Sequence, residues 1–136
     1  MSNKLDDTLQ RAMTGVPDCV AAGLVDLVSG MVLSVKTVDS HPSEVFDFLA
    51  AATADLFQGP NVVAIENIFK KSRGLPESSE HHYFQEVIVN SDNLIHVFIR
   101  GKKQQQVICF VCRKGANLGM VLTKARAGMP SVEAAI

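Results

Sequence analysis

Cys109 and Cys112 form the C-x-x-C motif that most directly suggests chemistry, because paired thiols bind metals or exchange disulfides. The motif falls inside the apolar run VICFVC, which is typical of a buried strand. Side chains alternate between the two faces of a sheet, so residues three apart point in opposite directions. The two sulfur atoms therefore cannot bind one zinc ion or form an ordinary disulfide with each other. We expect both to be buried structural cysteines.

Glu80, His81 and His82 are a second candidate, because carboxylate and imidazole groups bind zinc or nickel. Adjacent histidines at the start of a strand tend to point apart, and the sequence offers no obvious third or fourth ligand. This pattern favours solvated loop residues and no metal site. His96 lies inside another apolar run, where we expect a hydrogen-bonded core histidine and not a catalytic base.

The sequence contains no convincing catalytic set. No serine stands in a nucleophile elbow, and no pair of carboxylates suggests acid–base chemistry. Gly115–Gly119, GANLG, precedes a predicted helix whose amino terminus could bind an anion. It lacks both the Lys-Ser/Thr of a P-loop and the three spaced glycines of a dinucleotide fingerprint. We expect neither enzymatic activity nor a cofactor.

Two groups of basic residues could contact phosphates or an acidic partner: Lys70, Lys71 and Arg73, and Arg100, Lys102 and Lys103. Proteins that bind single-stranded nucleic acid place aromatic platforms among such charges, and this chain has no Trp and one Tyr. The net charge of -1 provides no general attraction to nucleic acid either. We expect solubilising charges at a helix end and a turn, and no nucleic-acid partner.

Three predicted strands position these side chains, at about 83–90, 94–100 and 106–112. They are apolar on both faces, with little of the alternation expected when one face meets water. Two shorter strands are predicted within 19–38, around the turn at Ser29-Gly30. A sheet that must be covered on both faces implies a three-layer α-β-α sandwich, here with five mostly antiparallel strands.

The helices complete the order α-β-β-α-β-β-β-α. The first is predicted at 4–14, and a long middle helix runs to about Gln58, where Gly59-Pro60 stops or kinks it. The segment 61–71 is a second helical segment or its continuation. Gly128 and Pro130 are expected to end the last helix.

The whole chain, 1–136, is the size of one domain. The region 72–82 combines Gly, Pro and serines and is predicted to be a loop insertion. The last residues, about 129–136, are expected to form a frayed tail.

The middle helix is more apolar than one sheet requires. Glu44, Asp47, Asp55 and Gln58 cluster in a narrow polar stripe at about 100° per residue. The remaining apolar arc covers roughly 240°, whereas an arc of ~100° suffices for a helix on one side of a domain. Either the 61–71 segment or the first helix covers the second apolar face, or a partner helix covers it in a dimer.

The third strand, YFQEVIV, interrupts its apolar residues with Gln85 and Glu86, as expected for an edge strand. An exposed edge can pair with another chain, and in a two-fold dimer the same edge meets itself. The helix and the edge together predict a homodimer. The predicted interface residues are Phe46, Leu49, Ala50, Thr53, Phe57, Phe84, Glu86 and Ile88.

Composition predicts a cytoplasmic protein. No apolar run approaches the roughly 20 residues that span a bilayer, and the first residues lack the apolar core of a secretory signal. Three cysteines, an odd number without the spacing of a disulfide framework, are typical of a reducing compartment.

Two segments resemble the Roadblock/dynein light-chain family. VAAGLVDLVSGMVLSV resembles its opening strand–turn–strand, with Asp26 and Gly30 around the turn, and CRKGANLGMVLTKAR resembles its closing strand-to-helix passage. The resemblance implies a profilin-like sandwich that forms homodimers through the middle helix and third strand. It also implies a non-catalytic scaffold or regulator of small Ras-like GTPases, including bacterial polarity GTPases, or a motor light chain.

Two functions remain open at this point. The first is a homodimeric interaction module that scaffolds or regulates a small Ras-like GTPase or a related signalling complex. The second is a small-molecule sensor with a pocket between sheet and helix, for which His96, Ser34 and Thr53 are the candidate polar lining residues.

Overall fold

The computed structural model describes the backbone of 4–38, 43–76, 82, 84–101 and 105–136, and the side chains of these residues except 43–48. The helices and strands follow the predicted order, with the middle helix divided in two. The elements are α1 (Lys4–Gly15), β1 (Cys19–Asp26), β2 (Met31–Thr37), α2 (Ser43–Gln58), α3 (Pro60–Ser72), β3 (Glu86–Asn90), β4 (Leu94–Arg100), β5 (Gln106–Arg113) and α4 (Leu118–Ala134).

The five strands form one sheet in the order β2-β1-β5-β4-β3, and every neighbouring pair is antiparallel. β5 lies at the centre, and all its residues before Arg113 are buried. β3 lies at one edge and is much more exposed, as its polar interruptions predicted. The predicted three-layer sandwich with a profilin-like fold is therefore confirmed.

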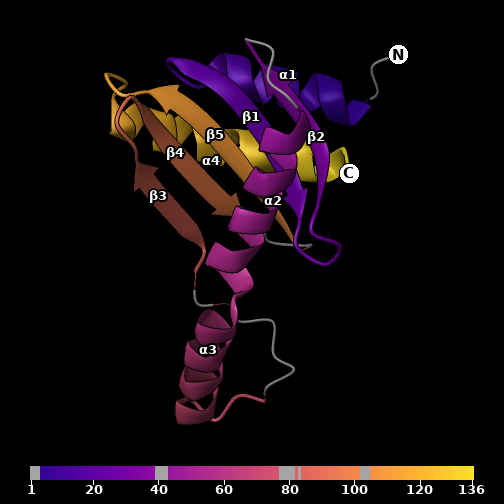
Figure 1. The fold of residues 1–136 in the computed structure, drawn as a ribbon, viewed down its shortest axis with the longest axis vertical. Coiled ribbons are helices and arrows are strands. Elements are labelled where there is room, and N and C mark those ends of the chain that lie inside the picture. Colours follow the sequence, from indigo (N-terminus) through magenta and orange to yellow (C-terminus); the bar gives the residue numbers. More distant parts are fainter. Residues whose placement is uncertain (1–3, 39–42, 77–81, 83, 102–104) are drawn as a thin grey trace.

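Helices cover both faces of this sheet (Figure 1). α1 and α4 pack together on one face, and α2 crosses the other face alone. Two apolar clusters result. The cluster under α1 and α4 includes Leu9, Val97, Phe110 and Val121, and the cluster under α2 includes Phe57, Phe98 and Cys109. Neither α1 nor α3 covers the outer face of α2 in the described part of the chain. α1 lies behind the sheet, and α3 extends beyond it (Figure 1).

The prediction that α4 ends at Gly128 and Pro130 is wrong. The helix continues to Ala134, and Met129 and Val132 in its last turns are buried in the core, so they do not form a frayed tail. Packing outweighs local propensity here. A Cβ atom at Gly128 would lie 3.2 Å from Cβ of Ala12, so the glycine allows α1 to approach α4 closely.

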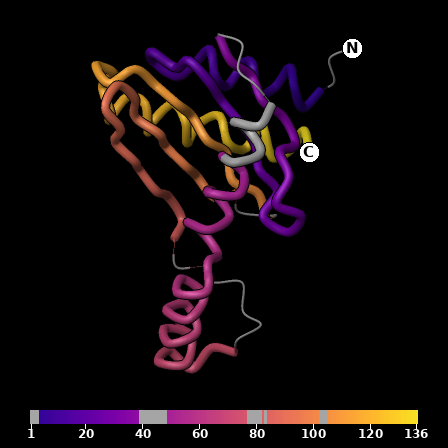
Figure 2. Tube along the Cα trace, in the orientation of Figure 1, coloured from indigo at the N-terminus to yellow at the C-terminus, as the bar shows by residue number. Residues whose placement is uncertain are grey.

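The middle helix breaks at Gly59, as the Gly-Pro pair predicted. Gly59 is the N-cap of α3 with an extended backbone, and Pro60 occupies the first turn. Beyond this joint, α3 projects from the body of the sandwich as an arm (Figures 1 and 2). No helix in the described part of the chain is long and apolar enough to cross a membrane.

We expect Gly59→Ala to destabilise the protein by about 1–3 kcal/mol, the usual cost of overpacking. An added Cβ would lie 2.6 Å from the backbone oxygen of Asp55, so the end of α2 or the start of α3 must move. Urea unfolding measures the effect. Gly115→Ala is the matched control, because nothing lies within 4 Å of its added Cβ. Equal stability of the two variants would show that the joint is not constrained.

Candidate functional site

The sheet takes one of the two apolar faces of α2 and leaves the other available. Ala50, Thr53 and Phe57 are buried against the sheet, and the Thr53 hydroxyl donates to the Leu49 backbone oxygen at 2.7 Å. Ala51 and Ala52 are exposed. Leu49 and Leu56 are half-buried beside them.

Among the predicted interface residues of α2 whose side chains are described, one differs in its placement from the other three. Ala50, Thr53 and Phe57 belong to the core of this chain, whereas Leu49 borders the outward face. The side chain of Phe46 lies outside the described residues. The described exposed residues of this helix are Ala51, Ala52, Asp55 and Gln58, and the two small alanines permit close approach of another helix.

β3 supplies the second part of the surface. Ile88 is exposed on this edge strand. Glu86 lies on the same side of the strand as Ile88 and contacts α4, because both of its carboxylate oxygens accept from Arg126, at 2.8 and 2.7 Å. This pairing lowers the pKa of Glu86. Phe84 precedes the strand and packs half-buried against the cluster under α2.

α3 presents its apolar side outward. Glu66 and Lys70 are only 6% and 7% exposed, while Ile68 and Phe69 are 67% and 44% exposed. An ordinary surface helix does the opposite, burying its apolar stripe and solvating its charges. The arm therefore has the amphipathic pattern of a helix whose apolar face meets another molecule.

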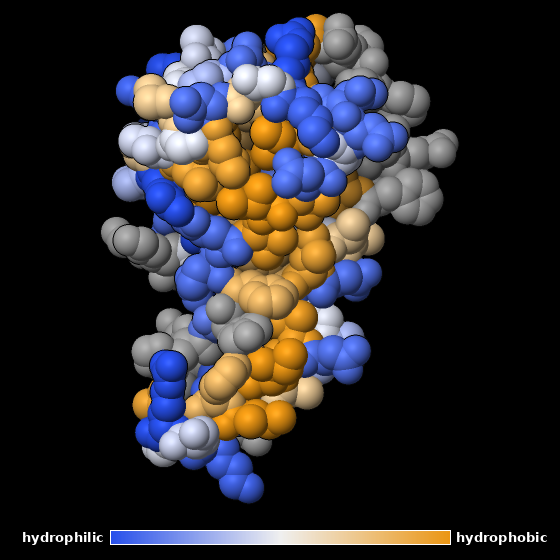
Figure 3. Space-filling view, turned by 90° about the vertical axis from the view of Figure 1, so that its left-hand side faces the viewer, coloured by the Kyte–Doolittle hydropathy of each residue, from blue (hydrophilic) through white to orange (hydrophobic). Residues whose placement is uncertain are grey.

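Figure 3 shows these parts as one surface. Apolar side chains extend without interruption from the body of the sandwich down over the projecting arm, with polar residues on either side. The exposed apolar residues on this side are Val89 of β3 and Val63, Ile65, Ile68 and Phe69 of α3. Ile88 lies on the side of β3 that faces α4, like Glu86. We call the first set, together with the exposed Ala51 and Ala52 of α2, the apolar face.

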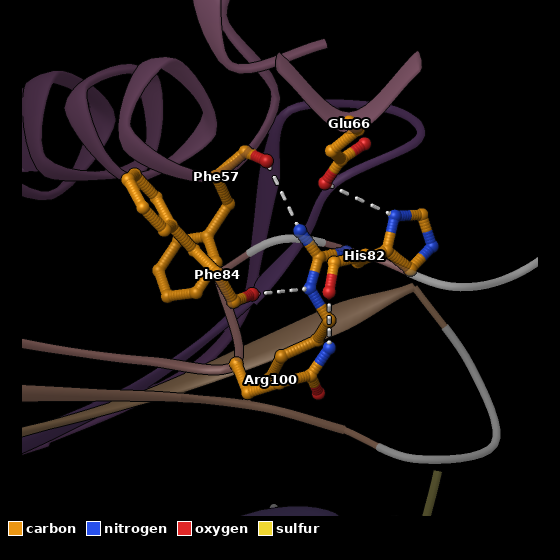
Figure 4. Close-up of polar contacts among 6 residues, drawn as sticks. Phe57, Glu66, His82, Phe84 and Arg100 are labelled. Carbon is orange, nitrogen blue, oxygen red and sulfur yellow. Dashed lines mark hydrogen bonds and ion pairs between the residues drawn. The ribbon is translucent and has the colours of Figure 1, made fainter. Parts of the chain in front are cut away.

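A buried arginine fixes the joint between the arm and the sheet (Figure 4). Arg100, at the end of β4, donates from Nε to the Phe84 backbone oxygen and from Nη2 to the Phe57 backbone oxygen, both at 3.0 Å. Its guanidinium also lies over the Phe57 ring, 5.3 Å from the centroid. One side chain thus holds together the end of α2, the segment before β3, and β4.

Charged groups from the arm reach the same joint. Nδ1 of His82 lies 3.6 Å from Oε2 of Glu66 (Figure 4). Burial and the positive charge of Arg100 lower the pKa of His82, and the carboxylate of Glu66 only partly opposes them. Burial likewise lowers the pKa of Arg100, which the charge of Glu66 partly offsets.

The thiol and imidazole candidates occupy structural positions. Cys109 lies in the cluster under α2 and Cys112 in the cluster under α1 and α4, so the C-x-x-C pair does face opposite sides. Burial raises the pKa of the Cys109 thiol to about 12. His96 is half-buried near the Ser91 hydroxyl, at 3.5 Å, and burial lowers its pKa. Among the described residues, no three metal-ligating side chains gather.

The described residues of the two basic groups differ in their burial. Lys70 and Arg100 are buried, whereas Lys71 and Arg73 are exposed at the end of α3. Glu80, His81, Lys102 and Lys103 lie outside the described residues. The GANLG segment starts α4, where the side-chain oxygen of Asn117 accepts from the Met120 amide at 3.1 Å, as a helix cap does.

The polar residues proposed for a sensor pocket do not converge. The Ser34 hydroxyl donates to Asp6 of α1, on one side of the sheet. Thr53 lies on the other side, under α2, and its hydroxyl is engaged by its own helix. A cavity of about 230 Å³ lies elsewhere, between the β3–β4 end of the sheet and α4, and its Glu86 carboxylate is already paired with Arg126.

The arginine at the joint and the reversed polarity of α3 were not predicted from the sequence. Arg100 follows an apolar strand and precedes a turn, which is also the pattern of a solvated turn charge. A helical wheel of 60–72 alone would have separated Glu66 and Lys70 from Ile65, Ile68 and Phe69. It would not have shown which side faces the protein.

We expect Arg100→Met to destabilise the protein by at least about 2 kcal/mol, because two buried carbonyl oxygens lose their donor. Arg126→Met, which breaks the exposed pair with Glu86, should have a much smaller effect, because exposed ion pairs contribute little to stability. Urea unfolding of both variants checks the comparison. A smaller loss for Arg100→Met than for Arg126→Met would contradict the role of Arg100 as an anchor.

The free energy of unfolding should decrease as the pH falls through 6.5, the ordinary histidine pKa. His82 and His96 have lowered pKa values when folded, so the unfolded chain binds more protons in this range. The contribution of these two histidines to stability is therefore complete above this pH and is lost as the pH falls below it. Replacing both with Asn should flatten the profile between about pH 7.5 and 5.5. An unchanged slope in the double variant would contradict this assignment.

No family model matches the chain, and no curated protein matches it. Solved structures do. MglB of Myxococcus xanthus is 17% identical with a TM-score of 0.67, covering 95% of this chain and 91% of that one. A Roadblock/LC7 domain from Streptomyces avermitilis is 16% identical with a TM-score of 0.67, covering 98% and 97%.

A profilin of Schizosaccharomyces pombe is also similar, at 10% identity and a TM-score of 0.57, covering 96% of this chain and 97% of the profilin. These likenesses extend over nearly the whole chain and agree with the strand order and the helices on both faces. The chain has a Roadblock/LC7 fold of the profilin-like type.

Proposed function

We propose that this protein is a non-catalytic, homodimeric interaction module of the cytoplasm that scaffolds or regulates a small Ras-like GTPase. The observation that carries this proposal is the continuous apolar face along α2, β3 and α3 (Figure 3). Extended apolar surfaces rimmed by polar residues mark sites of protein–protein contact.

A second copy of the chain is the proposed occupant of the body of this face. The free edge of β3 can pair antiparallel with its own copy across a two-fold axis. In that arrangement the outward sides of two α2 helices can lie beside each other over the extended sheet. Leu49, Ala51, Ala52 and Ile88 supply the contacts, with Ala50, Thr53 and Phe57 supporting them from within each chain.

The GTPase is the proposed occupant of the arm. α3 extends beyond the sheet and exposes Ile65, Ile68 and Phe69 where a third protein can reach them. The sequence resemblance to Roadblock proteins implies a GTPase as the partner class, and the Roadblock/LC7 fold is consistent with that resemblance. Arg100 does not act as an arginine finger in this proposal, because its guanidinium is buried and engaged by two carbonyls.

Ala52→Glu should convert the dimer to a monomer, because it places a carboxylate in the apolar contact between two α2 helices. Ala52 is exposed in the single chain, so its folding should be unaffected. Light scattering coupled to size-exclusion chromatography over a hundredfold dilution measures the mass. Ala127→Glu is the matched control, because Ala127 is also exposed and lies on α4, which covers the opposite face of the sheet. A wild-type mass of one chain, or a dimeric Ala52→Glu, would rule out this interface.

Ile68→Asp should abolish GTPase binding and leave the dimer intact, because Ile68 is exposed on the arm and away from β3. Binding is measured by calorimetry with small Ras-like GTPases of the same organism, each loaded with GDP or a non-hydrolysable GTP analogue. Arg73→Asp, at the end of the arm, tests whether charge alone is responsible. Absence of binding by every GTPase in both nucleotide states would contradict the proposed partner.

A further inference from the structure

The sheet brings together a pair of cysteines that the sequence does not suggest. Cys19, the first residue of β1, is the register partner of Cys112 in β5. Both contact the apolar cluster under α1 and α4, whereas Cys109 lies on the other face. In an antiparallel pair, opposed Cα atoms are about 4.5–5.5 Å apart, within the range of about 4.4–6.8 Å that a disulfide spans.

The two thiols already contact each other and differ in their environment. Their side chains are hydrogen-bonded, and Cys19 Sγ also lies 3.1 Å from the Ala21 backbone oxygen. Cys112 is fully buried, whereas Cys19 is half-buried at the start of its strand. A small oxidant can therefore reach Cys19 first.

The electrostatics support the same order of events. The hydrogen bond from Cys112 lowers the pKa of Cys19, and the same contact with burial raises the pKa of Cys112. The thiolate is the reactive form of cysteine. Cys19 is thus the residue that reacts with oxidant, and Cys112 retains its proton until the second step.

We propose that Cys19 and Cys112 form a redox pair that hydroperoxides oxidise to a disulfide between β1 and β5. In the first step, the Cys19 sulfur attacks the peroxide oxygen, the O–O bond breaks, and a sulfenic acid forms as water (or an alcohol) leaves. In the second step, the Cys112 sulfur attacks the sulfenic sulfur, its proton leaves with the hydroxyl as water, and the S–S bond forms. The peroxide gains the two electrons that the thiols lose.

The pair lies on the face covered by α1 and α4, opposite the apolar face along α2. Its chemistry therefore does not depend on the proposed dimer or its partner. A disulfide there would join the start of β1 to the end of β5, next to the turn in which Asp18 accepts from the Arg113 amide. In a reducing compartment such bonds are transient and act in redox sensing.

The test is oxidation of the purified, folded protein with hydrogen peroxide, followed by alkylation under denaturing conditions and peptide mapping. We expect a Cys19–Cys112 cross-linked peptide, a loss of two hydrogen atoms per chain, and full reversal by dithiothreitol. Cys109→Ala should retain the cross-link, whereas Cys19→Ser and Cys112→Ser should lack it. Circular dichroism verifies that each variant is folded.

The order of attack is tested in Cys112→Ser, where dimedone should label a sulfenic acid at Cys19. Labelling of Cys19 in this variant, with the cross-link in the wild type, supports the proposal. Cross-links that involve Cys109, or three free thiols in the wild type after treatment with peroxide, would overturn it. Sulfinic acid at Cys19 without any cross-link would overturn it as well.

Discussion

A central sheet that is apolar on both faces is the constraint on which the rest of this structure depends. Each face must be covered, and the chain covers them unequally. α1 and α4 lie together on one face, while α2 lies alone on the other. One helix cannot cover five strands, so Val89 of β3 remains exposed beside the half-buried Val87, and Ala51 and Ala52 of α2 remain exposed as well. The proposed dimer follows directly from this imbalance.

The arm depends on the sheet through one side chain. Arg100 is buried where β4 ends, and it donates to the carbonyl groups of Phe57, in the last turn of α2, and of Phe84, before β3. A buried guanidinium is costly unless it is hydrogen-bonded, so these contacts determine the position of the joint as well as its stability. Glu66 of the arm adds a polar contact at this joint, 3.6 Å from Nδ1 of His82. The polar side of α3 is thereby held toward the protein, which leaves its apolar side outward.

Much of the fold could be predicted from the sequence, because periodicity is a local property. The two-residue and 3.6-residue patterns located the strands, the long middle helix and its break at Gly59. The last helix was predicted too short at Pro130, because the burial of Val132 against distant residues outweighs the proline. The C-x-x-C motif was correctly assigned to opposite faces, again from periodicity alone.

The site was less predictable, because its residues meet through long-range contacts. The sequence showed that α2 has two apolar faces but not which one the sheet takes, since that depends on where the helix crosses the strands. Arg100 reaches carbonyls 43 and 16 residues away in sequence, which no local pattern encodes. The Cys19–Cys112 contact requires the register of β1 against β5, which appears only when the sheet is assembled.

The two hydrogen bonds of Arg100 also have an evolutionary consequence. They hold the backbone at Phe57 and at Phe84 to the same guanidinium, so the chain leaves and rejoins the sandwich at one place. Lengthening a connection whose ends are already held together adds little closure entropy, since that cost grows only with the logarithm of length. The segment between Phe57 and Phe84 can therefore be shortened, extended or exchanged while the sheet stays unchanged. Insertion and deletion between these two residues would change the arm without changing the strand order of the sheet.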